Sequence, residues 1–336
     1  MVKTENTMTF TSEEYVRVAI VGAGPAGIGA AIGLVKRGIE PIMILERRSK
    51  AGGIPANYFV ESGSVPTYVS YSHGRVIFGQ QFVSDLLSKL ENFKVDLRLE
   101  STVIDLNASE ICLSVVDPKR GKYLIQAEAI LIATGAREQT ITERGWISGI
   151  REGRLFQTLQ LLEIFGHDTK FDIGKPVVLG SDLIAYSIAA KLGFLGANEV
   201  NMIDESRRPK TFLPARLYFR RWVKSKWHQS TGLELVKNSN GGYKIIMSDN
   251  RSISVDADTT LVSGNLVPNS ELLVSSGFKV KPLTNAPIVS SRGQLSNPAI
   301  FVTGNVIGFS HGGQRSYFNG LSVAKTVANF LEERKS

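Results

Sequence analysis

The stretch that decides the fold is Val16–Glu46, which reads VRVAIVGAGPAGIGAAIGLVKRGIEPIMILE. A short apolar run leads into the glycine-rich turn Gly22–Gly27. A run of small and apolar residues then continues to Gly38, and a second apolar run, 41–45, ends in Glu46. This order predicts a strand, a tight turn, a helix, a second strand and an acidic residue, which together are typical of a βαβ unit that binds a dinucleotide.

Each position in this stretch has a physical role in such a unit. Gly22 permits the turn, Gly24 lets the backbone approach a pyrophosphate, and Gly27 lets the helix lie close to the strand. The helix begins at Pro25–Ala26, where N–H groups and partial positive charge face the phosphates. Glu46 follows Gly22 by 24 residues, close to the spacing expected for the acid that binds the ribose hydroxyls. The alternative is a buried βαβ unit whose glycines serve packing only.

Composition limits the remaining choices. The chain has 336 residues, of which 43% are hydrophobic and 21% charged, enough for two domains. Residues 1–15 are polar and lack the pattern of a signal peptide, so we expect a disordered lead-in and a cytoplasmic protein. No apolar run is long enough to span a bilayer. The single cysteine, Cys112, excludes an intrachain disulfide, a C-x-x-C pair and a cysteine-rich metal site, and we expect no metal.

The middle of the chain predicts regular elements around a long loop, 54–78. Apolar spacing predicts a helix over 79–92. Strands are expected at 94–99, 102–106, 111–116 and 123–127, with a hairpin turn at 117–121. The segment Ala133-Thr134-Gly135 ends a further buried strand with a turn of small residues.

A second unit of the same plan begins at the apolar run 176–179. It has a turn at Gly180, a helix to about 192, and a strand that ends in Asp204. Asp204 follows Gly180 by 24 residues, the same spacing as from Gly22 to Glu46. Asp182 stands where the second glycine is expected, Ile184 or Ala185 stands where the third is expected, and we expect the alignment to need a gap. Because an acid would repel a pyrophosphate, this unit is predicted to keep the fold with weak or no NAD(P) binding.

If NAD(P) does bind, Gly180 would form the turn and Asp204 would favour NAD. Arg207 and Arg208 would instead accommodate a 2′-phosphate. Between 207 and 226 there are eight basic residues and no acid. We favour a surface helix whose Phe219, Val223 and Trp227 pack inward; the alternative is a docking face for a partner subunit, an anionic substrate or a membrane. No motif indicates nucleic acid.

The last unit is again a strand, a glycine turn and a helix. The strand covers 299–303, the turn contains Gly304 and Asn305, and an apolar helix is expected over 314–331. These pieces, in this order, resemble the pyridine nucleotide–disulfide oxidoreductase superfamily in its short, thioredoxin-reductase-like form. The resemblance covers about residues 16–332, and the stretch from Gly264 to Leu272 is one of the motifs on which it rests.

The resemblance implies an α/β fold of two Rossmann-like, three-layer domains that bind FAD and NAD(P), the second inserted in the first. The FAD-binding domain would comprise 16–150 and 265–336, and a degenerate NAD(P)-binding-like domain would comprise 151–264. The chain would then be an FAD-dependent oxidoreductase in which a hydride moves between a substrate carbon and the flavin. The family's C-x-x-C pair is absent.

The residues that would hold FAD follow from this resemblance. Asn305 stands where the family usually has an aspartate that holds the ribityl chain, and the helix start near Gly313 would face the pyrimidine end of the ring. The full set is Gly22, Gly24, Pro25, Ala26, Gly27, Glu46, Arg47, Gly53, Val103, Ala133, Thr134, Gly135, Gly304, Asn305, Gly313 and Gln314. His311 and His73 are candidates for a base or a substrate contact.

Two short stretches, 52–55 and 135–139, are similar to a branch of FAD-binding subunits from hydrogen cyanide synthase, opine oxidase and dye-linked proline dehydrogenase. That branch implies oxidation of C–N bonds in amines or amino acids, a partner subunit or electron carrier, and a homo- or hetero-oligomer. An NAD(P)H-dependent reductase of ferredoxin or quinone, and an FAD-carrying subunit without activity of its own, remain open alternatives.

Overall fold

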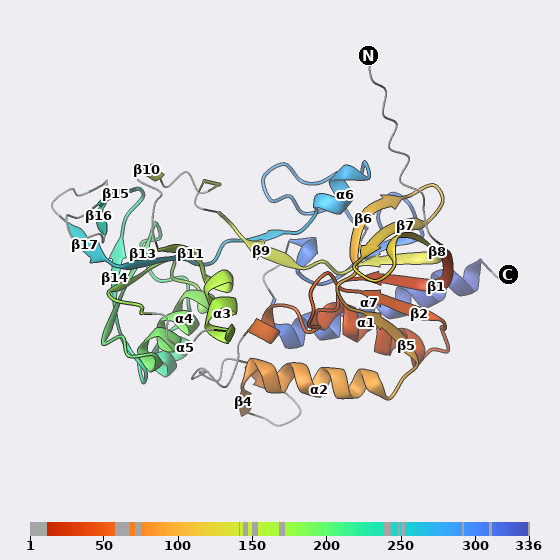
Figure 1. Cartoon of the computed structure of the whole chain (residues 1–336), viewed down its shortest axis with the longest axis horizontal. Coiled ribbons are helices and arrows are strands. Elements are labelled where there is room, and N and C mark those ends of the chain that lie inside the picture. The colour runs from red at the N-terminus through yellow and green to blue at the C-terminus, as the bar shows by residue number, and fades with distance from the viewer. Residues whose placement is uncertain are drawn as a thin grey trace, which may run out of the picture.

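The computed structural model describes residues 12–57, 68–70, 75–140, 142–143, 147–149, 154–167, 172–237, 243–247, 249, 253–290, 292–308 and 311–334. The chain forms two lobes connected by two short antiparallel strands, β9 (Ala136–Glu138) and β19 (Leu266–Pro268) (Figure 1). The chain leaves the first lobe through β9 and returns to it through β19. The second lobe is therefore inserted in the first, as predicted.

The first lobe is built on a sheet whose central strands are parallel. The parallel order is β5 (Val95–Arg98), β2 (Ile42–Leu45), β1 (Glu13–Val21), β8 (Gly121–Ile132) and β20 (Ile300–Val302). The first half of β8 also forms an antiparallel meander with β7 (Cys112–Asp117) and β6 (Thr102–Asn107). The sheet thus places three strand ends, those of β1, β8 and β20, next to one another.

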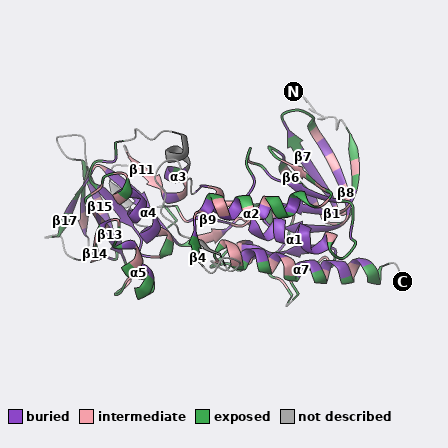
Figure 2. Cartoon of the chain, turned by 90° about the horizontal axis from the view of Figure 1, so that it is seen from below, coloured by how far each residue is buried: buried purple, intermediate pink, exposed green. Residues whose placement is uncertain are grey.

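Three layers follow from the alternation of side chains along the central strand. Val18 and Ile20 face a cluster made with the helices α1 (Pro25–Val35), α2 (Gly79–Glu91) and α7 (Gly313–Glu333). Ala19 and Val21 face the meander. Figure 2 shows the inner faces of these helices as buried.

The helices α1 and α7 cross very closely, since glycines line their contact. A side chain on Gly29 would collide with the carbonyl oxygen of Tyr317, and one on Gly320 would collide with that of Ala26. This close packing fixes the last helix of the chain beside the first. The N-terminus of α7 is thereby held near that of α1.

The second lobe repeats the parallel sheet and adds a small antiparallel one. The parallel order is β11 (Leu155–Gln157), β18 (Thr259–Val262), β12 (Pro176–Leu179), β13 (Glu199–Asp204) and β14 (Lys224–Gln229). The second sheet is β10 (Ile147–Gly149), β15 (Leu233–Lys237), β16 (Tyr243–Met247) and β17 (Ser254–Ala257). The helices α3 (Thr158–His167), α4 (Leu183–Phe194) and α5 (Leu213–Phe219) pack on the other face. The predicted α/β fold of two Rossmann-like domains is confirmed.

The remaining described elements of the first lobe are short. The segment predicted as a long loop contains the 3-10 turn η1 (Ile54–Asn57) and the hairpin strands β3 (Tyr68–Ser70) and β4 (Arg75–Ile77). The returning chain forms α6 (Glu271–Ser275) and the 3-10 turn η2 (Gly304–Ile307). Among the described helices, none is long and apolar enough to cross a membrane.

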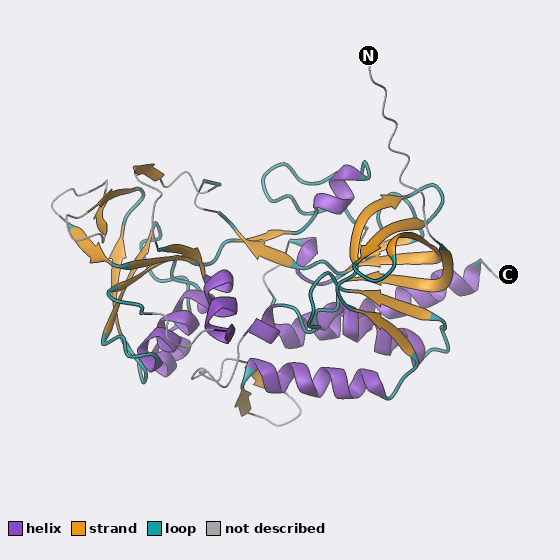
Figure 3. Cartoon of the chain, in the orientation of Figure 1, coloured by secondary structure: helices purple, strands orange, loops and turns teal. Residues whose placement is uncertain are grey.

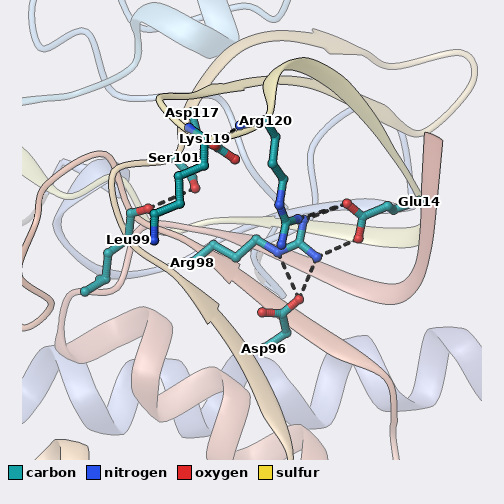
Figure 4. A network of polar contacts seen from close by, with 8 residues as sticks. All are labelled: Glu14, Asp96, Arg98, Leu99, Ser101, Asp117, Lys119 and Arg120. Carbon is teal, nitrogen blue, oxygen red and sulfur yellow. Dashed lines mark hydrogen bonds and ion pairs between the residues drawn. The ribbon is translucent and has the colours of Figure 1, made fainter. Parts of the chain in front are cut away.

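The predicted lead-in over 1–15 is wrong at its end, because β1 begins at Glu13. Glu14 accepts hydrogen bonds from both terminal nitrogens of Arg98, at 2.9 and 2.6 Å, and one from Arg120 at 3.0 Å (Figure 4). Arg98 also pairs with Asp96 at 2.8 Å. This network ties the first residues of β1 to β5 and to the turn of the meander.

Two other expectations are corrected. Strand β10 pairs with β15 of the second lobe, so the chain enters that lobe before the predicted boundary at 150. The helix expected to continue through Val223 and Trp227 ends at Phe219, and Trp227 lies in β14 (Figure 3). Only Phe219 and Val223 of this set are buried, because the chain turns from helix to strand between them.

Candidate cofactor site

The first glycine turn is packed so tightly that only glycine fits at two of its positions. Gly22 has a φ of +108°, and a Cβ there would lie 2.5 Å from the carbonyl oxygen of Ala133. A Cβ on Gly27 would collide with the carbonyl oxygen of Gly22. The turn therefore brings α1 onto β1 with its N-terminus aimed beyond the sheet edge.

The N-terminus of α1 forms an open cradle. Gly24 is its N-cap, and the described residues provide no side chain that caps it. The chain passes opposite at Gly53, whose left-handed φ of +63° brings its Cα within 3.9 Å of a Cβ built on Gly24. The backbone of Gly52 holds this segment by donating to the carbonyl oxygen of Ala23 at 2.8 Å. Backbone N–H groups at such a helix start suit a pyrophosphate.

Glu46 is buried at the end of β2 and is fixed by two backbone donors. Its Oε2 accepts from the N–H of Ala23 at 2.9 Å, and its Oε1 accepts from the N–H of Arg48 at 3.0 Å. Each carboxylate oxygen keeps a further lone pair, so the ribose hydroxyls of a nucleotide remain suitable partners. The predicted neighbour Arg47 is exposed.

Sequence reasoning missed Arg48 and Asn57. Nη1 of Arg48 donates to Oδ1 of Asn57 at 3.0 Å and so holds η1 beside the glycine turn. Nδ2 of Asn57 is buried and has no hydrogen-bond partner within the described chain. An orphaned donor at this place indicates a bound group that accepts a hydrogen bond. No short motif marks either residue.

The second predicted segment, Ala133-Thr134-Gly135, follows β8 directly and is clamped by Asn269. Gly135 has a φ of +73°, and a Cβ there would meet no described atom within 4 Å. Val103 lies half-buried on β6, whose start is tied to the Glu46 carbonyl oxygen by the N–H of Ser101 at 2.8 Å. These residues surround the same sheet edge.

The third segment lies between β20 and α7. Gly304 has a φ of +78°, and a Cβ there would lie 2.7 Å from that of Ala26. The side chain of Asn305 bridges the backbone of His311: Oδ1 accepts from its N–H at 2.9 Å, and Nδ2 donates to its carbonyl oxygen at 3.0 Å. An aspartate could not make the second bond. The amide therefore shapes the entrance to α7 and keeps one N–H for a ligand.

The first turn of α7 is open as well. Its N-cap is Gly312, which no side chain caps among the described residues, and a Cβ there would meet nothing within 4 Å of that part. Gly313 and Gln314 begin the helix, so its N–H groups and partial positive charge face outward from the sheet edge. Burial, and then the charge of Arg315, lower the pKa of His311, which favours its neutral form. His73 lies outside the described residues.

The topology brings these three segments together. Val21, Ile132 and Val302 stand level across β1, β8 and β20, so the turns that follow them share one edge of the sheet. Two uncapped helix N-termini and glycine positions with open space therefore meet there. These features fit FAD, whose pyrophosphate would lie at α1 and whose ring would lie toward α7.

The second lobe reproduces the first turn position by position. The N–H of Gly180 donates to the end of β13 at 2.8 Å, as that of Gly22 does to the end of β2, and each helix begins three residues later. The expected alignment gap is therefore wrong. Asp182 corresponds to Gly24, and Ala185 corresponds to Gly27.

Asp182 caps α4 with its own carboxylate. Its Oδ1 accepts from the N–H of Ala185 at 2.9 Å, and the hydroxyl of Ser263 donates to the same oxygen at 3.4 Å. A side chain on Gly264 would collide with the carboxylate. Gly24 leaves the N-terminus of α1 open in the first lobe, whereas the equivalent residue of the second lobe is an acid.

The other predicted nucleotide contacts of this lobe lie nearby. Asp204 is buried and pairs with Nζ of Lys210 at 3.4 Å. Burial opposes ionisation of Asp204, but hydrogen bonds from Ser206 and Ser181, together with the charge of Lys210, lower its pKa. Arg207 is exposed. The acid that would bind a ribose is therefore in place, whereas the pyrophosphate position is not free.

Glu138, at the end of β9, is a buried acid that sequence reasoning did not select as a site residue. Its Oε2 accepts from the N–H of Leu159 at the start of α3 at 2.8 Å, and its Oε1 has no hydrogen-bond partner within the described part. Burial raises the pKa of Glu138 to about 7. No cluster of three or more His, Cys, Asp or Glu side chains that could hold a metal occurs among the described residues.

Two linked Rossmann-like lobes, with an open dinucleotide cradle in the first and a helix N-terminus aimed at the far end of that cradle, define a two-domain flavoprotein. The match to a family model over residues 16–326 then gives the family. The chain belongs to the pyridine nucleotide-disulphide oxidoreductases and is an FAD-dependent oxidoreductase.

Individual relatives match parts of the chain. It is 30% identical over 172 residues to the hydrogen cyanide synthase subunit HcnB of Pseudomonas aeruginosa, which covers 51% of this chain and 33% of HcnB. It is 30% identical over 124 residues to a ferredoxin–NADP reductase of Leuconostoc citreum, covering 37% of this chain and 34% of that protein. The matched stretch thus spans about a third of either curated relative.

Solved structures share the fold over nearly the whole chain. Thioredoxin reductase of T. acidophilum superposes with a TM-score of 0.74 at 18% identity, covering 94% of this chain and 98% of that one. L-proline dehydrogenase of P. horikoshii superposes with a TM-score of 0.70 at 18% identity, covering 96% of this chain and 56% of that one.

Proposed function

We propose that this protein oxidises a C–N bond of a small amine or amino acid and passes the electrons to a carrier other than NAD(P). The observation that carries the proposal is the position of the only cysteine. Cys112 lies buried in β7 of the meander, and burial raises the pKa of its thiol, which keeps it protonated. The dithiol relay of the thioredoxin reductases is therefore not available to this chain, which supports a substrate that reacts at the flavin directly.

Similarity favours the C–N class of substrate. HcnB is by name a subunit of hydrogen cyanide synthase, and the proline dehydrogenase acts by name on an amino acid. Bound FAD would supply the two-electron chemistry. The chain's own residues would hold it: Gly24 and Glu46 at the adenosine end, and the N-terminus of α7 at the ring.

A protein partner fits this proposal, since HcnB is by name a subunit of a larger enzyme. We propose a partner subunit or an electron carrier, and a cytoplasmic setting. The α5 region offers a surface for it: Phe212, Leu213 and Leu217 are 63%, 56% and 53% exposed. Exposed apolar residues beside a basic stretch are typical of an interaction site for an acidic protein.

The test is an anaerobic titration of the FAD-containing protein with a panel of amines and amino acids, followed at 450 nm. Bleaching by one member, with turnover when an artificial dye is present, would support the proposal and would exclude a subunit that lacks activity of its own. A chain that bleaches with no amine, and copurifies with a second polypeptide that restores turnover, would instead be the FAD-carrying subunit.

The second candidate is an NAD(P)H-dependent reductase. The match to ferredoxin–NADP reductase favours it, as does the retained acid Asp204 at the end of β13. In the same titration, rapid bleaching by NADH or NADPH would select this function. Absence of bleaching by either nucleotide would remove it.

A further inference from the structure

We infer that Asp182 closes the second dinucleotide site, so that this lobe keeps a nucleotide-binding fold without binding NAD(P). The family implies a nicotinamide nucleotide in the second lobe, and the residues present there do not fit its pyrophosphate. Closure of this lobe is compatible with oxidation of an amine at the flavin and incompatible with the NAD(P)H-dependent reductase.

The two equivalent helix starts, those of α1 and α4, differ in whether a side chain caps them. Gly24 carries no side chain, so the N-terminus of α1 remains open to an anion. At the same position on α4, the Asp182 carboxylate already accepts the N–H of Ala185 at 2.9 Å. A pyrophosphate would compete with an acceptor that is covalently held in place, because both would use the same donors.

The Asp182 carboxylate also occupies space at the edge of the sheet. It reaches across from α4 to the turn after β18, where it accepts from Ser263 at 3.4 Å and fills the place that a Cβ on Gly264 would need. In the first lobe Gly24 has no side chain to reach the turn after β8, and a Cβ built on it would meet only Gly53 within 4 Å among the described residues. A dinucleotide crosses its sheet edge between such a turn and the helix, and in the second lobe an acid stands there.

The negative charge at this end of the second lobe also opposes a pyrophosphate. Glu138 lies close enough for the charge of Asp182 to contribute to its raised pKa, so two acids meet at this end of the second lobe. A pyrophosphate brings further negative charge to the same place. Lys210 pairs with Asp204 at 3.4 Å, at the position expected for the ribose.

The rest of the site is preserved, which makes the closure a matter of one residue. Gly180 has the required φ of +139°, and Ala185 is small enough for α4 to pack closely. Asp204 is positioned as Glu46 is. Removing the side chain of Asp182 should therefore reopen the cradle.

The experiment measures binding of ADP-ribose, NADH and NADPH to the FAD-containing full chain by calorimetry. ADP-ribose reads the pyrophosphate site without redox chemistry. For the unchanged protein we expect no binding at millimolar ADP-ribose. Asp182→Gly should bind it about 100-fold more tightly, the size expected when a like charge at an anion site is removed. Asp182→Asn, which keeps the cap without the charge, should gain less.

Asp256→Asn is the matched control, because it removes one exposed acid from the same lobe on β17, in the antiparallel sheet and away from the loop; it should change nothing. Asp182→Ser replaces Asp182→Gly in the binding measurement if the glycine variant does not retain FAD. Micromolar binding of any of these three probes by the unchanged chain would overturn the inference. So would two FAD-containing variants at position 182, glycine and serine, that bind ADP-ribose no better than the unchanged chain does.

Discussion

Thr134 and Asn269 bond to each other at the point where both connections between the lobes leave the first lobe. The Thr134 hydroxyl donates to the carbonyl oxygen of Asn269 at 2.8 Å, and Nδ2 of Asn269 donates to the carbonyl oxygen of Thr134 at 2.9 Å. The N–H of Asn269 also donates to the carbonyl oxygen of Gly135 at 3.0 Å. The turn at the sheet edge is thereby held by the returning chain.

This clamp predicts that Asn269→Ala weakens FAD binding. The substitution removes one of the three bonds and leaves the Thr134 carbonyl oxygen unpaired, at a cost of about 1–2 kcal/mol. FAD retention after dialysis, followed by absorbance at 450 nm, should fall, together with the melting temperature. Asn297→Ala removes a comparable amide bond, from Nδ2 to the carbonyl oxygen of Ala108, and the bond that Oδ1 accepts from the N–H of Ala299, both away from the cradle. Equal FAD loss in both variants would contradict a specific role for the clamp.

Gly24→Asp should convert the first loop into a copy of the second. The backbone of Gly24 has a φ of −75° and a ψ of 178°, which an aspartate adopts without strain, and a Cβ there has no described atom closer than 3.9 Å. We expect the apoprotein to be at least as stable as before, because α1 gains a cap worth about 1 kcal/mol. FAD content should fall to near zero. A protein that retains its yellow colour at full occupancy would refute the assignment of the pyrophosphate to this helix.

Asn305→Asp restores the residue usual in the family and should nevertheless destabilise this chain. The carboxylate would keep the N–H of His311 but would face its carbonyl oxygen without a proton to donate. Loss of that bond, with repulsion between the two oxygens, predicts a cost of about 1–3 kcal/mol. Thermal unfolding of the apoprotein measures this cost separately from FAD affinity. An unchanged melting temperature would show that the 305–311 bridge does not support the loop.

The sequence predicted those parts of the site that depend on local sterics. Gly22 and Gly27 are required by contacts within one βαβ unit, so their spacing alone indicates the turn. The helices 79–91 and 313–333 follow from apolar spacing and were placed within one or two residues. Alternation and turn residues likewise gave the meander strands, apart from the continuity of β8.

What the sequence did not reveal depends on contacts between distant segments. Glu138 and Leu159 meet only because β9 enters the second lobe beside α3, and the orphaned amide of Asn57 follows from packing around Arg48. The role of Asp182 as a cap needed the backbone geometry of α4. The change from helix to strand after Phe219 was hidden because helix and strand patterns can bury the same aromatic residues.

Burial of Glu138 predicts a measurable pH dependence of stability. The pKa of Glu138 in the folded chain, about 7, lies above the ordinary value of 4.5. Between pH 4.5 and pH 7 the folded state therefore holds a proton that the unfolded state has lost. Stability should therefore fall as pH rises from 4.5 to 7 and then stay level, with a loss on the order of 3 kcal/mol. The groups that face this carboxyl are Asp182, Thr158 and the backbone of Leu159 and Gly264.

Glu138→Gln removes this titration while keeping an acceptor for the N–H of Leu159. The difference in melting temperature between Glu138→Gln and the unchanged chain should be roughly 5 °C more favourable to the variant at pH 8 than at pH 5. Glu143→Gln is the control, since the bond from Arg137 lowers the pKa of Glu143 to about 2, below the range tested. That variant should shift the melting temperature by the same amount at both pH values. Parallel pH profiles for the unchanged chain and Glu138→Gln would mean that Glu138 does not carry the proton.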